Sequence, residues 1–112
     1  MADTSSRFKA WLAEQGHELE VRRFPEGTRT AEDAARAIGC DVAQIVKSLV
    51  FLAGERPVVA LVSGGNRLSV AKLSALAAAP VRKAEAEAVR SASGYSIGGV
   101  PPFGHATPMP VF

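Results

Sequence analysis

The pattern of apolar and polar residues predicts helices and short strands that alternate along the chain. The segment Ile45 to Leu52 is apolar on both faces, which is typical of a central strand that is covered on both sides. Pro57 follows a short turn and opens a second apolar segment, Val58 to Val62, so the two segments are expected to form a hairpin. Helices are also predicted for Thr4 to Gln15, Thr30 to Ile38, Val70 to Ala78 and Glu85 to Ser93, and shorter strands for Glu18 to Arg23, Val81 to Lys83 and Thr107 to Phe112.

Composition narrows the class of protein to a single globular domain. The 112 residues are 47% hydrophobic and 21% charged, as in an ordinary folded domain. No apolar run approaches the roughly 20 residues that span a bilayer, and Met1 to Arg7 lack the apolar region of a signal peptide, so we expect a cytoplasmic protein without a membrane partner. The single cysteine, Cys40, excludes an internal disulfide and a cysteine-rich metal site.

The net charge of +2 is only mildly basic and does not by itself indicate a nucleic-acid-binding protein. The basic residues nevertheless form clusters, which are either solvated surface or a rim that faces phosphate groups. These clusters are Arg22, Arg23 and Arg29, then Arg67 and Lys72, then Arg82 and Lys83.

Lys47 is the anomalous residue of the predicted central strand. Ile45, Leu49 and Phe51 share its face, and the opposite face is apolar as well. Placing an ammonium group in such surroundings is costly unless the group is paired or reaches a cavity. Lys47 therefore either extends from an edge into solvent, or lines a pocket where it holds an anion or stabilises developing negative charge.

A loop rich in glycine and proline, Gly98 to Gly104, is the second candidate for function. Glycines let a backbone approach a ligand closely and prolines hold one shape, so exposed N–H groups of this loop can bind a carbonyl oxygen or a phosphate. A plain structural loop is the alternative. The two histidines, His17 and His105, match no spacing of a metal site or a catalytic triad.

Three segments together resemble the YbaK/prolyl-tRNA synthetase-associated editing family in order and spacing. They are Thr30 to Ala35, Ile45 to Phe51 and Gly98 to His105. The resemblance implies an α/β fold with a mixed, curved, barrel-like β-sheet flanked by helices, and an activity that needs neither metal nor cofactor. It also implies that residues 1–112 form one editing-type domain that lacks the C-terminal part of the family.

The resemblance further implies that the chain is an aminoacyl-tRNA deacylase, a trans-editing factor that removes a small amino acid wrongly attached to tRNA, with tRNA for proline favoured. The alternative is a non-catalytic module that binds tRNA or a synthetase. The implied partners are the 3′ end of aminoacyl-tRNA, an aminoacyl-tRNA synthetase, and a second copy of the chain paired through an open sheet edge. Lys47 is the implied catalytic residue, and the implied substrate-binding residues are Phe24, Thr30, Ser48, Gly98, Gly99, Val100, Pro101, Pro102, Gly104 and His105.

Overall fold

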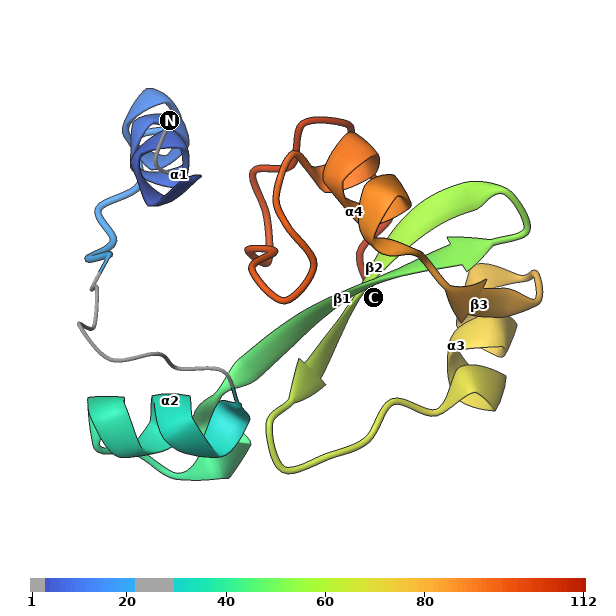
Figure 1. Ribbon diagram of the computed structural model, residues 1–112, viewed down its shortest axis with the longest axis horizontal. Helices are drawn as coiled ribbons and strands as arrows, with labels where there is room; N and C mark the ends of the chain where they lie inside the picture. The colour runs from blue at the N-terminus through green and yellow to red at the C-terminus, as the bar shows by residue number, and fades with distance from the viewer. Residues whose placement is uncertain (1–3, 22–29) are drawn as a thin grey trace.

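The computed structural model describes residues 4–21 and 30–112, and Figure 1 shows their arrangement. Its elements, in chain order, are the helices α1 (Thr4–Glu14) and α2 (Ala31–Ile38), the 3₁₀ turn η1 (Val42–Gln44), the strands β1 (Val46–Ala53) and β2 (Arg56–Ser63), the helix α3 (Val70–Ala77), the strand β3 (Val81–Lys83) and the helix α4 (Ala86–Ser93). None of the helices in the described ranges is both long and apolar enough to cross a membrane.

The sheet is antiparallel, with strand order β2-β1-β3. The β1–β2 hairpin pairs over its whole length, from Val46 opposite Ser63 to Ala53 opposite Arg56. This confirms both the predicted hairpin and the central position of β1. The strand β3 pairs only with the last three residues of β1, Phe51 to Ala53. The first half of β1 therefore has β2 on one side and no strand on the other within the described residues.

The predicted barrel-like closure of the sheet is wrong. A barrel requires its first and last strands to be hydrogen-bonded to each other. Here β3 lies on one side of the hairpin, whereas the last residues lie along the outer edge of β2, where Val111 forms an isolated parallel bridge with Val59. The Val59 N–H donates to the Pro110 carbonyl over 2.9 Å, and the Leu61 N–H donates to the Phe112 carbonyl over 2.7 Å. The sheet stays open because these two edges never meet.

Each face of the sheet packs against a different helix. Phe51, Val58 and Ala60 form one core cluster with Leu73 of α3, while Val50 and Val59 form another with Ala84 and with Val89 of α4. Figure 1 shows α4 and the long loop that follows it on one side of the hairpin and α3 on the other. Because neighbouring residues of a strand point to opposite faces, the apolar run of β1 supplies both clusters. We call these the α3 face and the α4 face.

Local signals account for the ends of α2. The hydroxyl of Thr30 accepts a hydrogen bond of 3.0 Å from the backbone N–H of Asp33, so Thr30 caps the N-terminus of the helix. By contrast, the strand predicted for Glu18 to Arg23 is absent from residues 18–21, which have no strand beside them. Alternation of apolar and polar side chains forms a strand only where a second backbone offers hydrogen bonds.

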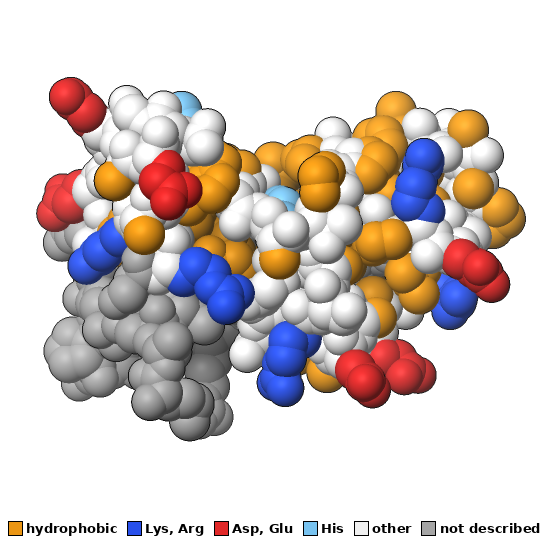
Figure 2. All heavy atoms as spheres, turned by 90° about the horizontal axis from the view of Figure 1, so that it is seen from above, with side chains coloured by type: hydrophobic (Ala, Val, Ile, Leu, Met, Phe, Trp, Pro, Cys, Tyr) orange, Lys and Arg blue, Asp and Glu red, His pale blue; other side chains and the backbone are white. Residues whose placement is uncertain are grey.

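The helix α1 reaches the rest of the domain through aromatic rings. The rings of Phe8 and Trp11 lie 5.6 and 5.4 Å from the ring of Phe103, between centroids. Gly104 lies against Trp11 with a φ of 76°, and a Cβ atom added to it would stand 2.9 Å from Trp11 Cδ2. Figure 2 shows hydrophobic side chains gathered in the seam between α1 and the rest of the molecule. The glycine-rich loop is thus held on one side by α1.

Candidate active site

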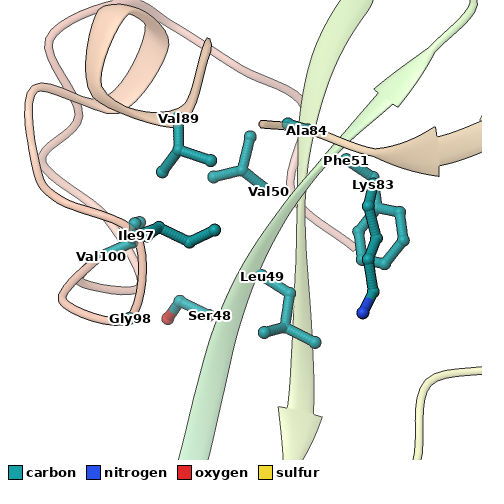
Figure 3. Close-up of a pocket in the computed structure, with 10 residues that line it drawn as sticks. All are labelled: Ser48, Leu49, Val50, Phe51, Lys83, Ala84, Val89, Ile97, Gly98 and Val100. Carbon is teal, nitrogen blue, oxygen red and sulfur yellow. The ribbon is translucent and has the colours of Figure 1, made fainter. Parts of the chain in front are cut away.

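A cavity of about 230 Å³ lies between β1, α4 and the glycine-rich loop. In Figure 3 the Ser48 hydroxyl points from β1 toward the loop, close to Gly98. The strand β1 supplies one wall, α4 supplies Val89, and the loop supplies the opposite wall. Apart from Ser48 and Lys83, the lining side chains are apolar or glycine. The lining residues are Ser48, Leu49, Val50, Phe51, Lys83, Ala84, Val89, Ile97, Gly98 and Val100.

The first half of β1 has no strand on its β3 side within the described residues, and this open side gives the pocket a polar edge. In an antiparallel ladder, the N–H and C=O of one residue point to the same neighbouring strand, and alternate residues share that direction. The Val50 carbonyl points to the β3 side, where it accepts a hydrogen bond of 3.4 Å from the Ala84 N–H. The backbone groups of Ser48 therefore point the same way, past the end of β3. Both the side chain and the backbone of Ser48 are offered to the pocket.

The glycine-rich loop has a fixed shape, and its hydrogen bonds decide which of its N–H groups are available. The Gly99 N–H donates to the Ser96 carbonyl over 2.9 Å, and Gly98 turns the chain with a φ of 84°. Pro101 and Pro102 have no N–H to offer. Within the described part of the chain, the N–H groups of Gly98 and Val100 have no acceptor. These two donors are therefore the candidates for binding an oxygen of a ligand.

His105 is hydrogen-bonded to the backbone of the glycine-rich loop. Its Nε2 lies 2.7 Å from the Pro101 carbonyl oxygen. A carbonyl only accepts, so Nε2 carries the proton of this hydrogen bond. The half-buried imidazole therefore acts on the backbone of the loop, and it is not among the residues that line the pocket.

The start of the loop is anchored to α4 by a buried serine. Ser93 is fully buried; its hydroxyl donates to the Val89 carbonyl over 2.6 Å and accepts from the Tyr95 N–H over 3.1 Å. Tyr95 is also buried, and burial raises the pKa of its phenol above 10.0, an effect that the charge of Arg7 partly opposes. Among the described residues, the Tyr95 hydroxyl has no hydrogen-bond partner.

Lys47 lies on the other face of β1 from Ser48. It shares the α3 face with Leu49 and Phe51, and its ammonium donates a 2.8 Å hydrogen bond to the carbonyl oxygen of Asn66, in the turn after β2. Lys47 is half-buried and is not among the residues that line the pocket. The ammonium therefore finds a partner at the edge of the sheet rather than in an apolar core.

The structure brings together only part of the residue set taken from the sequence. Ser48, Gly98 and Val100 meet at the pocket, whereas Thr30 caps α2 and Gly104 packs on Trp11. Pro101 and Pro102 are half-buried in the loop, and Gly99 is exposed. None of these three residues lines the pocket. Phe24 lies outside the described residues.

Two kinds of lining residue were not identified from the sequence. Lys83 is a pocket residue that the sequence marked only as one member of a basic cluster. Apolar residues such as Val89 and Ile97 gave no signal that distinguishes them from ordinary core. No group of three or more His, Cys, Asp or Glu side chains in residues 4–21 and 30–112 is placed to hold a metal ion.

The sequence is similar to a known protein family and to several known proteins. Residues 25–112 match the family model described as the aminoacyl-tRNA editing domain. The chain is 37% identical over 87 residues to the proline–tRNA ligase of Elusimicrobium minutum (strain Pei191), an alignment that covers 77% of this chain but only 15% of that ligase. It is 29% identical over 102 residues to the protein YwhH of Bacillus subtilis (strain 168), covering 90% of this chain and 62% of YwhH.

A solved structure resembles the whole fold. It is the crystal structure of a protein proposed to be a trans-editing enzyme for prolyl-tRNA synthetase, with a TM-score of 0.92 and 45% sequence identity. The match covers 99% of this chain and 71% of that one.

Proposed function

The chain belongs to the aminoacyl-tRNA editing domain family, and from this premise we propose that it hydrolyses misacylated tRNA as a separate trans-editing factor. Two comparisons support the choice of substrate. The relatives include proline–tRNA ligases, and the similar solved structure is described as acting for prolyl-tRNA synthetase. We therefore propose a small amino acid wrongly attached to tRNA for proline as the substrate, and the cytoplasm, where tRNA is charged, as the place of action.

The observation that carries this proposal is the pocket between Ser48 and the Gly98–Val100 segment. Its volume of about 230 Å³ and its apolar floor suit a small side chain. The Ser48 hydroxyl and backbone offer hydrogen bonds to the α-amino group. The Gly98 and Val100 N–H groups have no acceptor among the described residues, and they would bind the oxyanion that forms when water attacks.

The chemistry is the hydrolysis of an activated ester. Water adds to the carbonyl carbon, the bond to the terminal ribose oxygen breaks, and the products are the free amino acid and a tRNA with a free 3′-terminal hydroxyl. Fixing water or a neighbouring ribose hydroxyl beside the carbonyl supplies most of what the protein must add. His105 and Pro101 keep the loop donors in place through their 2.7 Å contact.

We propose Lys47 as the catalytic lysine, acting on the ribose or phosphate of the terminal nucleotide rather than inside the amino-acid pocket. Its position on the α3 face, with its ammonium on the Asn66 carbonyl, supports this role. There it would reduce the negative charge that develops near the ester. Phe24, Thr30, Gly99, Pro102 and Gly104 remain proposed substrate-binding or supporting residues.

One observation favours a second candidate function, a module that binds tRNA or a synthetase without hydrolysis. Among the described residues that line the pocket there is no Asp, Glu or His, so the lining offers no carboxylate or imidazole as a general base.

A second copy of the chain is a further proposed partner, since the open edge of β1 can pair with another strand. Such pairing would cover Ser48, and size-exclusion chromatography at several concentrations tests it.

The deciding experiment incubates the protein with a panel of tRNAs charged with labelled alanine, serine, threonine, cysteine or proline, and follows the free amino acid. We expect release from at least one misacylated tRNA for proline and none from the correctly charged one. Lys47→Ala should lower kcat/KM by about 100-fold or more, in the range for loss of one charge-stabilising group, while Lys9→Ala on α1 is the matched control. Binding without release for every tRNA would favour the non-catalytic module.

A further inference from the structure

Of the described residues that line the pocket, Lys83 alone carries a charge. We propose that Lys83 binds the phosphodiester backbone next to the aminoacylated end of the RNA, and that Lys47 is the second cation of the same contact. The proposal rests on the proposed RNA substrate and adds a binding residue for it. Three features of the structure support this role.

The first feature is the position of Lys83 at the rim of the pocket. It is the last residue of β3 and lies opposite Phe51 of β1. Figure 3 shows its side chain beside Phe51, across β1 from Ser48 and the loop. The pocket therefore spans the unpaired edge of β1, with apolar walls and Ser48 on the α4 face and Lys83 on the α3 face. An amino acid held at the α4 face would leave its nucleotide at this rim.

The second feature is that Lys47 and Lys83 lie on the same face of the sheet. Lys47, Leu49 and Phe51 alternate with residues of the α4 face, and Lys83 is paired with Phe51. At about 3.4 Å per residue, the backbones of Lys47 and Phe51 are about 14 Å apart along the strand. Two long, flexible side chains at the ends of this span can contact two phosphates of the same RNA strand.

The third feature is the distribution of negative charge. Among the residues that the structure describes, no acidic side chain lines the pocket and Lys83 forms no ion pair. Arg82, Glu85 and Glu87 line a separate open hollow that Lys83 also borders, so the charges on that side are mixed. The pocket side has no carboxylate among its described lining residues, so the favourable path to Lys83 is along the edge of β1 and past Lys47.

The test measures RNA binding separately from hydrolysis. The probe is an uncharged, fluorescently labelled acceptor-stem RNA ending in CCA, titrated by anisotropy at several salt concentrations. We expect Lys83→Met to weaken binding by about fivefold at low salt, as for one ion pair at contact distance. The slope of log affinity against log salt should fall by about 0.7, the value for one phosphate contact in a single strand. Lys83→Arg should restore both quantities.

Arg56→Met provides the matched control, because Arg56 begins β2 at the hairpin turn and does not line the pocket. It removes the same charge and should leave the salt slope unchanged. If Lys83→Met has the slope and affinity of Arg56→Met, or if the wild-type protein binds no acceptor-stem RNA, the proposal is overturned. A protein that binds RNA through Lys83 but releases no amino acid would support this inference while refuting the proposed hydrolase.

Discussion

The contact between Gly104 and Trp11 should be the most sensitive point in the attachment of the glycine-rich loop. Replacing Gly104 with alanine puts a Cβ atom 2.9 Å from Trp11 Cδ2 and 3.1 Å from Cε3, closer than such atoms approach. The ring of Trp11 packs against those of Phe8, His17 and Phe103 at centroid distances of 6.3, 5.8 and 5.4 Å, so it can move away from Gly104 only by disturbing these contacts. The added methyl group must therefore separate the loop from α1.

The size of the effect follows from two contributions. A non-glycine residue at a φ of 76° costs about 1–2 kcal/mol. Loss of the Trp11–Phe103 aromatic pair adds about 0.5–1.5 kcal/mol beyond the area that it buries. We therefore expect Gly104→Ala to lower the free energy of unfolding by about 1.5–3.5 kcal/mol.

Urea unfolding followed by tryptophan fluorescence measures this change, because Trp11 is the only tryptophan of the chain. Native Gly104→Ala protein should also show a red-shifted emission as Trp11 becomes more exposed. Gly39→Ala is the matched control: Gly39 has a φ of 86° but open space around its Cβ position, so only the backbone strain applies. If the two variants agree within about 0.5 kcal/mol, which is the scatter for independent sites, and neither shifts the emission, the reasoning is refuted.

Three further predictions concern groups that position the loop and α2. Ser93→Ala should cost about 1–3 kcal/mol in urea unfolding, because it leaves the Tyr95 N–H without its buried acceptor; an unchanged stability would contradict the anchoring role. Tyr95→Phe should be neutral or stabilising near pH 7, since the buried hydroxyl has no partner in the described structure. Burial raises the folded-state pKa of Tyr95 above 10.0, so the wild-type protein should lose stability as pH rises from about 10 through the folded pKa, because the phenol ionises more readily in the unfolded chain. The stability of Tyr95→Phe should therefore fall less steeply above pH 10, and equal slopes would argue against the raised pKa. Thr30→Ala should cost about 1 kcal/mol through the lost cap on the Asp33 N–H, with a drop in helical circular dichroism, whereas Thr30→Ser should lose much less.

Much of the fold could be read from local patterns. The run of β1 that is apolar on both faces predicted a central strand. The helix predicted for Thr30 to Ile38 matches α2, whose ends are fixed by the capping hydroxyl of Thr30 and the left-handed Gly39, and both act within one turn of the chain. The alternating segment at Leu19 and Val21 was misread, since its signal needs a second strand that the fold does not bring to it. The closure of the sheet was likewise decided by distant edges.

For the candidate site too, some residues could be singled out from the sequence, whereas their arrangement depended on the tertiary structure. Lys47 and the loop from Gly98 to Pro102 could be identified from the sequence, because a charge in an apolar strand and a dense run of glycine and proline are visible in one dimension. The sequence could not show that Ser48 faces the loop while Lys47 faces the other way. Alternation assigns neighbours to opposite faces, but which helix covers which face depends on how α3 and α4 pack.

By itself, therefore, the sequence determined most of the elements, the family resemblance and the residues worth testing. Only the tertiary structure placed Lys83 at the pocket, paired β3 with the last three residues of β1 alone, and directed the Lys47 ammonium to the Asn66 carbonyl. The physical reason is the separation along the chain between the residues that interact. Helix caps, turns and strand patterns depend on residues a few positions apart, whereas a pocket is made where β1, β3, α4 and the loop meet, and only packing of the whole chain brings them together.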